Sequence, residues 1–131
     1  MKVGIVGLGF VGIQFAVHIG RKFQVVGLDL DEQEITDYHA NYDATGEVSE
    51  AELRAATHLE FTTQPSRLKG CDIFIIAVPT PVDPKKNPDF GPLVSASRTV
   101  GSVMASGATV VYESTVYPGA TEDKALSYWS P

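Results

Sequence analysis

The sequence predicts an α/β fold in which a doubly wound parallel sheet is covered by helices on both faces, giving three layers. Three observations predict this class. Five short apolar runs recur along the chain, and stretches with helical spacing or helix-start signals separate most of them. A glycine-rich turn joins the first run to the first helical stretch. Alternating strands and helices are typical of a mostly parallel sheet between two helical layers.

The predicted elements follow one another in strand–helix order. Strands are expected at about 2–7, 24–28, 59–62, 72–78 and 109–112, and helices at about 10–22, from about 31, at 50–56 and at 91–105. A further helix is expected to begin at Gly119. The first helix is supported by Val11, Phe15 and Ile19, which recur near helical spacing. Ser49 reads as the N-cap of the helix at 50–56, and Glu52 completes a capping box.

The glycine-rich turn carries the strongest functional signal of the chain. Residues 7–12 read Gly-Leu-Gly-Phe-Val-Gly, they follow a strand, they open a helix, and Asp29 ends the next strand. This is the dinucleotide-binding fingerprint of the Rossmann fold. Gly7 permits a tight turn, Gly9 lets backbone approach a pyrophosphate, and Gly12 lets the helix pack close to the sheet. Asp29 is placed to accept hydrogen bonds from the adenosine ribose. The alternative is a merely tight strand–helix turn.

The start of the first helix completes the predicted phosphate site. Phe10 and Val11 lie where free N–H groups and the positive end of the helix dipole favour an anion. The cofactor is expected to be NAD rather than NADP. A 2′-phosphate would meet Asp29 with Glu34 and other acids close in sequence, and no arginine is near to pair with it.

Two later segments also follow strands at the edge where ligands bind in open α/β sheets. Val78 ends the fourth strand and Thr80 follows it, and Ser114 and Thr115 follow the fifth. Hydroxyls and backbone N–H groups would there meet the cofactor's ribose and nicotinamide. In the alternative interpretation the neighbouring prolines only stiffen a loop, and Ser114 only caps a helix.

Composition narrows the class of protein. The chain has 131 residues, which fits one domain, and a formal charge of −6, which argues against a nucleic-acid partner. Its apolar runs are too short to span a membrane, and no leader precedes the first strand, so a cytoplasmic protein is expected. The single cysteine, Cys71, excludes an intrachain disulfide, and the three histidines lie far apart, so no metal site is expected.

Three motifs in order resemble the amino-terminal domain of the UDP-glucose/GDP-mannose dehydrogenase family. They are the glycines at 7–12, Val-Pro-Thr-Pro-Val at 78–82, and Tyr-Glu-Ser-Thr-Val-Tyr-Pro-Gly-Ala-Thr-Glu at 112–122. The run Pro-Asp-Phe-Gly-Pro-Leu at 88–93 looks closest to the UDP-N-acetylhexosamine 6-dehydrogenase branch. The resemblance covers about residues 1–123. It implies an oxidoreductase that converts the C6 hydroxyl of a UDP-sugar to a uronic acid in two NAD-dependent steps, for surface polysaccharide biosynthesis.

The resemblance also implies roles for single residues. Gly7, Gly9, Gly12 and Asp29 would bind NAD. Val78, Thr80 and Ser114 would line the cofactor site. Thr115 matches a family threonine near the reacting centre that helps to hold a catalytic water.

The chain departs from the family pattern in three ways. The family's nucleophilic cysteine, its catalytic lysine and its dimer helix belong to segments that are absent here. Cys71 cannot substitute, because strands rise about 3.3 Å per residue and it lies seven residues, roughly 20 Å, from the cofactor end of its strand. Glu34 replaces a basic residue of some relatives. Residues 124–131 do not look like the family's continuation.

These departures set the expected organisation. Residues 1–131 are predicted to be a partial NAD-binding domain that lacks the sixth strand of this fold and the substrate domain, and to be inactive alone. A homo-oligomer stays open. The alternatives are a stand-alone nucleotide-binding or regulatory module, or the first domain of a 3-hydroxyacid-type or 6-phosphogluconate-type dehydrogenase. The motifs at 78–82 and 112–122 disfavour the last two.

Overall fold

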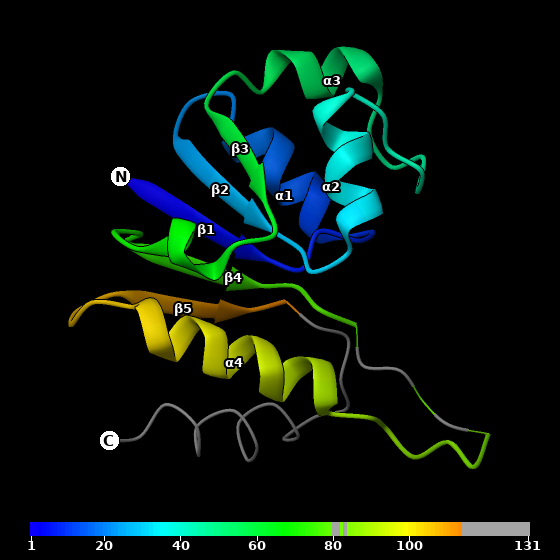
Figure 1. Ribbon diagram of the computed structural model, residues 1–131, viewed down its shortest axis with the longest axis vertical. Helices are drawn as coiled ribbons and strands as arrows, with labels where there is room; N and C mark the ends of the chain where they lie inside the picture. Colours follow the sequence, from blue (N-terminus) through cyan, green and yellow to red (C-terminus); the bar gives the residue numbers. More distant parts are fainter. Residues whose placement is uncertain (80–81, 83, 114–131) are drawn as a thin grey trace.

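Five parallel strands form one sheet in the order β3-β2-β1-β4-β5. The computed structural model describes residues 1–79, 82 and 84–113. The strands are β1 Lys2–Val6, β2 Gln24–Leu28, β3 Leu59–Thr62, β4 Ile73–Ile76 and β5 Thr109–Tyr112. After β3 the chain crosses back past β1 to form β4, so the topological switch point lies between the neighbouring strands β1 and β4 (Figure 1). The predicted doubly wound class is confirmed.

The two faces of the sheet bury separate cores. Successive side chains of a strand point to opposite faces. Ile5 therefore lies in one apolar cluster and Val6 in the other, and Ile75 and Ile76 divide in the same way. Burial on both faces explains why the central strands β1 and β4 are apolar almost throughout.

Three helices cover the first face, namely α1 Gly12–Ile19, α2 Glu32–His39 and α3 Glu50–Ala55. Their apolar residues, such as Ile13, Ile35 and Leu53, pack in the cluster that contains Ile5. The expected capping box starts α3: the Ser49 hydroxyl accepts from the Glu52 N–H at 3.1 Å, and the Ser49 N–H donates to the Glu52 carboxylate at 3.1 Å.

The second face is covered by α4 Gly91–Val103 and by a short 3-10 helix, η1 Pro65–Leu68. Figure 1 shows α4 running alongside β5, at the opposite end of the molecule from α3. The Ser97 and Tyr112 hydroxyls, 3.0 Å apart, link α4 to β5. Helices on both sides of the sheet give the three predicted layers.

Some boundaries differ from those expected. The helix expected at 10–22 covers only residues 12–19, because residues 9–11 form a turn with Val11 as N-cap, and Gly20 is the C-cap. The strand expected at 72–78 is paired with its neighbours only over residues 73–76. Residues 77–79 lie beyond the end of this strand and line a cavity. The 3-10 helix was not predicted. Within the described residues the sheet has five strands, and the segment from Gly119, expected to begin a further helix, lies outside them.

Candidate functional site

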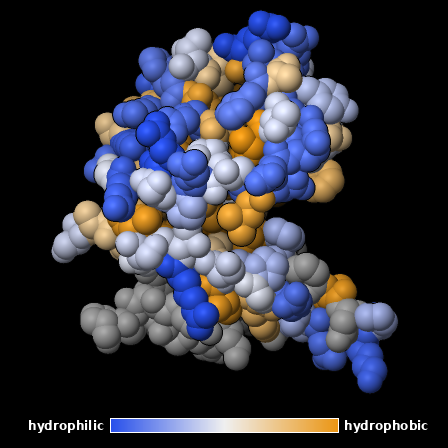
Figure 2. Space-filling model, in the orientation of Figure 1, coloured by the Kyte–Doolittle hydropathy of each residue, from blue (hydrophilic) through white to orange (hydrophobic). Residues whose placement is uncertain are grey.

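A cleft of about 700 Å³ opens at the carboxyl ends of β1, β2, β4 and β5. Figure 2 shows the surface hollowed on the side where these strands end. The cleft is lined by Val6, Gly7, Gly9, Phe10, Val11, Leu28, Asp29, Leu30, Asp31, Glu34, Ala77, Val78, Pro79, Pro92, Ser95, Ala96, Thr99 and Glu113. It includes the switch point between β1 and β4, where ligands bind in open α/β sheets.

Gly7 makes the tight turn out of β1. Its φ of 89° lies in the left-handed region that L side chains rarely adopt. Its N–H donates to the Leu28 carbonyl at 2.9 Å, which joins the turn to the end of β2. A Cβ here would also lie 2.7 Å from the Val78 Cγ1 atom, so backbone conformation and space both require glycine.

Gly9 and Gly12 serve different purposes. A Cβ on Gly12 would overlap the carbonyl oxygen of Gly7, and the Ala77 side chain lies 3.5 Å away. Gly12 therefore mainly lets the start of α1 lie against the glycine turn. The expectation from the sequence was that it lets the helix pack close to the sheet. A Cβ on Gly9 would meet no protein atom within 4 Å. Gly9 therefore leaves space that belongs to the cleft.

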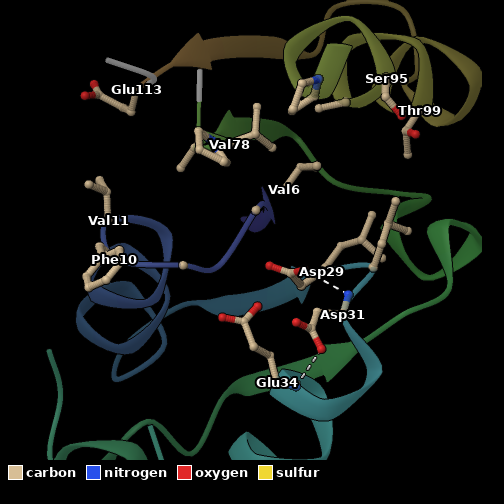
Figure 3. A pocket seen from close by; sticks show the side chains of 18 residues that line it. Val6, Phe10, Val11, Asp29, Asp31, Glu34, Val78, Ser95, Thr99 and Glu113 are labelled. Carbon is tan, nitrogen blue, oxygen red and sulfur yellow. Dashed lines mark hydrogen bonds between the residues drawn. The ribbon is translucent and has the colours of Figure 1, made fainter. Parts of the chain in front are cut away.

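The turn that leads into α1 lies beside the cleft. The Ile13 N–H bonds to the Leu8 carbonyl and the Gln14 N–H to the Val11 carbonyl. The N–H groups of residues 10–12 precede the first hydrogen bonds of the helix, so they have no acceptor within α1. Phe10 and Val11 line the cleft, and the Phe10 side chain is 62% exposed beside it (Figure 3).

Asp29 is held by two backbone N–H groups. Its Oδ2 atom accepts from Leu8 at 2.9 Å and its Oδ1 atom accepts from Asp31 at 3.0 Å. The first bond crosses from β2 to the glycine turn. A carboxylate has about four acceptor positions, so this side chain keeps capacity for a ligand's hydroxyl groups.

Glu34 lies beside Asp29 in the same wall of the cleft. Burial, and next the Asp29 carboxylate, raise the pKa of Glu34 from 4.5 to about 7. Hydrogen bonding to Asp29 acts in the same direction, because only the protonated Glu34 can donate to a carboxylate.

The opposite wall comes from α4 and from the ends of β4 and β5. Pro92, Ser95, Ala96 and Thr99 line the cleft from one side of α4. Sequence reasoning missed them, although their spacing of three and four residues is that of one helical face. It also missed Glu113 and Leu30 as residues of the cleft. Leu30 is 71% exposed there.

The structure brings most of the predicted site residues together. Gly7, Gly9, Phe10, Val11, Asp29 and Val78 line one cleft, and Gly12 shapes its turn. Thr80, Ser114 and Thr115 lie outside the described residues.

Cys71 lies away from the cleft. It precedes β4, is 3% exposed, and packs with Leu68 and Phe74 in the core beneath α4. Burial raises the pKa of its thiol, so it is a poor nucleophile. In the part of the chain that the structure describes, no His, Cys, Asp or Glu residues gather into a metal-binding group, and no helix could cross a membrane.

The fold and the cleft define a dinucleotide-binding domain, because a phosphate could approach the backbone at Gly9 and a ribose could reach Asp29. The model of the UDP-glucose/GDP-mannose dehydrogenase family, NAD binding domain, matches residues 1–129. The chain belongs to this family, and its cofactor is NAD.

Individual relatives agree with this assignment. The chain is 49% identical to UDP-N-acetyl-D-glucosamine 6-dehydrogenase of Pseudomonas aeruginosa, over 96% of this chain and 30% of that protein. It is 48% identical to Protein CapL of Staphylococcus aureus, over 95% of this chain and 29% of that protein. A solved structure of a UDP-D-ManNAc dehydrogenase from Pyrococcus horikoshii superposes with a TM-score of 0.89, at 33% identity, over 98% of this chain and 32% of that one. The chain thus spans about 30% of the length of these curated relatives.

Proposed function

We propose that this chain is the NAD-binding part of an enzyme that oxidises the C6 hydroxyl of a UDP-N-acetylhexosamine to a uronic acid. The observation that supports it most directly is the open space at Gly9 beside the helix start, in a chain 49% identical to such a 6-dehydrogenase. The product class suits the synthesis of surface polysaccharides in the cytoplasm. Assembly as a homo-oligomer is part of the proposal.

The proposed cofactor contacts follow from the lining of the cleft. The N–H groups of residues 10–12, at the positive end of the α1 dipole, bind the pyrophosphate. The free lone pairs of Asp29 accept hydrogen bonds from the adenosine ribose hydroxyls. Leu30 and Phe10 offer exposed apolar surface to the flat rings of the ligand. Val78 lines the cleft beside them. The resemblance in sequence leads us to propose cofactor contacts also for Thr80 and Ser114, which lie outside the described residues.

The chemistry divides between cofactor and protein. Bound NAD supplies a hydride acceptor. The chain's part is to hold the nicotinamide end against β4 and β5, with Thr115 holding a water near the reacting carbon. The sugar-binding groups and the nucleophilic cysteine of the second oxidation are proposed to lie in the part of the relatives that this chain does not span.

A glycine substitution tests the proposal by calorimetry. The unaltered chain should bind NAD, and Gly9→Val should lose binding because the side chain fills the space that the pyrophosphate needs. Since nothing surrounds that space, Gly9→Val should unfold at nearly the same temperature as the unaltered chain. Gly101→Val, equally unobstructed on α4 and away from the cleft, is the matched control and should bind NAD normally. Equal NAD binding by both variants would refute the proposed site.

A further inference from the structure

Carboxylates gather at one end of the cleft. Asp29, Asp31 and Glu34 lie together there, and Glu113 lies at the other end (Figure 3). None of the described residues that line the cleft is a lysine, an arginine or a histidine. An anionic group on the adenosine ribose would therefore meet acids and no cation in this wall.

The three acids at this end have different partners. Asp29 accepts two backbone N–H groups, from Leu8 and Asp31. Asp31 is the N-cap of α2, and its Oδ1 atom accepts from Gln33 at 3.0 Å and from Glu34 at 3.2 Å. The Glu34 carboxyl interacts instead with the Asp29 side chain. Glu34 is therefore the acid in this wall whose charge is not balanced by backbone donors of the α2 start.

Glu32 and Glu34 look equivalent in sequence but not in space. Both belong to the first turn of α2, yet only Glu34 lines the cleft, whereas Glu32 is exposed outside it. Sequence proximity to Asp29 thus does not decide which glutamate can act on a ligand.

We propose that Glu34 is a specificity-determining residue, which rejects a 2′-phosphate on the adenosine ribose when it is charged and much less when it is protonated. The inference rests on the proposed cofactor site. It goes beyond the presence of a ribose-binding acid, because it makes the preference for NAD over NADP depend on pH and assigns that dependence to one side chain.

The physical basis is the difference between hydroxyl and phosphate. A ribose hydroxyl donates to a carboxylate, whereas a 2′-phosphate carries about −1.5 to −2 charges near neutral pH and presents acceptor oxygens. Beside Asp29, a charged Glu34 adds like-charge repulsion in a partly desolvated wall. A protonated Glu34 removes that charge and can donate its proton to the phosphate.

The groups that face Glu34 shift its change from protonated to charged toward neutral pH. They are Asp29 from the end of β2, Asp31 from the α2 cap, Asp43 from the segment after α2, and Tyr38 from the next turn of α2. Burial, and next the three carboxylates, raise the pKa of Glu34 to about 7. The Asp43 side chain accepts hydrogen bonds from the Thr45 and Val48 N–H groups, which hold it in place beside α2.

Calorimetric titrations of NAD and NADP across neutral pH test the inference with Glu34→Gln. At about pH 8 this variant should bind NADP about tenfold more tightly than the unaltered chain does. Because Glu34 lines the cleft, NAD is titrated with the same variant, and its NADP-to-NAD affinity ratio should rise about tenfold relative to that of the unaltered chain. At about pH 5.5, where Glu34 is protonated, the two proteins should bind NADP alike. The comparison at each pH cancels the titration of the phosphate itself.

Glu32→Gln is the matched control, since it removes the same charge from the same helix turn outside the cleft. It should leave the NADP-to-NAD ratio unchanged. If Glu34→Gln and Glu32→Gln change the ratio equally, or if the effect of Glu34→Gln is the same at both pH values, the inference is wrong. If the unaltered chain does not bind NAD at all, the proposed function fails and the inference fails with it. Normal NAD binding with an unaltered ratio in Glu34→Gln would overturn only the inference.

Discussion

The Oδ2 atom of Asp29 accepts a hydrogen bond from the Leu8 N–H at 2.9 Å, although the two residues are 21 positions apart. The bond joins the end of β2 to the glycine turn after β1. The carboxylate that is proposed to bind ribose thus also holds the loop that is proposed to bind pyrophosphate. Both halves of the ligand site depend on one side chain.

Asp29→Ala should therefore lower both NAD affinity and stability. The part-buried N–H of Leu8 and the exposed N–H of Asp31 lose a charged acceptor, which costs about 1.5–3 kcal/mol in the free energy of unfolding. Urea unfolding measures that loss, and calorimetry should show at least about tenfold weaker NAD binding. Asp72→Ala is the control, because Asp72 accepts the Lys2 N–H at 2.9 Å at the far end of β1. It should lose some stability and no affinity. Equal NAD affinity in the two variants would contradict the role of Asp29.

Gly12→Ala should destabilise the fold itself. The new Cβ would overlap the Gly7 carbonyl oxygen, and backbone on both sides of the turn would have to move. We expect a loss of about 3 kcal/mol or more in the free energy of unfolding, in the range of severe core substitutions. Gly9→Ala is the control, since its Cβ meets nothing within 4 Å. Thermal unfolding of both variants decides: a Gly12→Ala protein as stable as Gly9→Ala would show that the turn is not as close-packed as described.

The sequence predicted the sheet well because its central strands, β1, β2 and β4, are buried on both faces. The spacing of apolar residues and the local composition were sufficient to predict β2, β3 and β5, whose bounds in the structure match those expected. The wall formed by α4 was not foreseen, because Ser95 and Thr99 are ordinary helix residues until the crossover places them over the cleft. Nor could sequence separate Glu34 from Glu32. Spacing gives neighbours along the chain, whereas a ligand meets the residues that share a surface.

Glu34 should also make stability depend on pH. Its pKa is raised in the folded protein to about 7, from 4.5, so the folded state binds more protons between these values. The free energy of unfolding should therefore fall as pH rises through this window, relative to Glu34→Gln, which cannot ionise. After allowance for solvent screening we expect Glu34→Gln to be about 1 kcal/mol more stable at about pH 8 and equal at about pH 4.5. Urea unfolding at both pH values measures this, with Glu32→Gln as control. A constant difference across the window would show that Glu34 ionises normally.

The chain by itself should bind NAD without oxidising a UDP-sugar. Hydride transfer requires the sugar to be held against the nicotinamide, and the second oxidation in this family uses a cysteine nucleophile. The only cysteine of the chain, Cys71, is buried in the core beneath α4, on the amino side of β4, whereas the cleft lies at the carboxyl end. An assay of NADH formation with UDP-N-acetylhexosamines at high protein concentration should therefore show no turnover, while calorimetry on the same sample shows NAD binding. Cys71→Ser should bind NAD as the unaltered chain does. Turnover that disappears in Cys71→Ser would place chemistry at that thiol, and turnover that persists would mean that the described cleft, with the residues after it, suffices for the first oxidation.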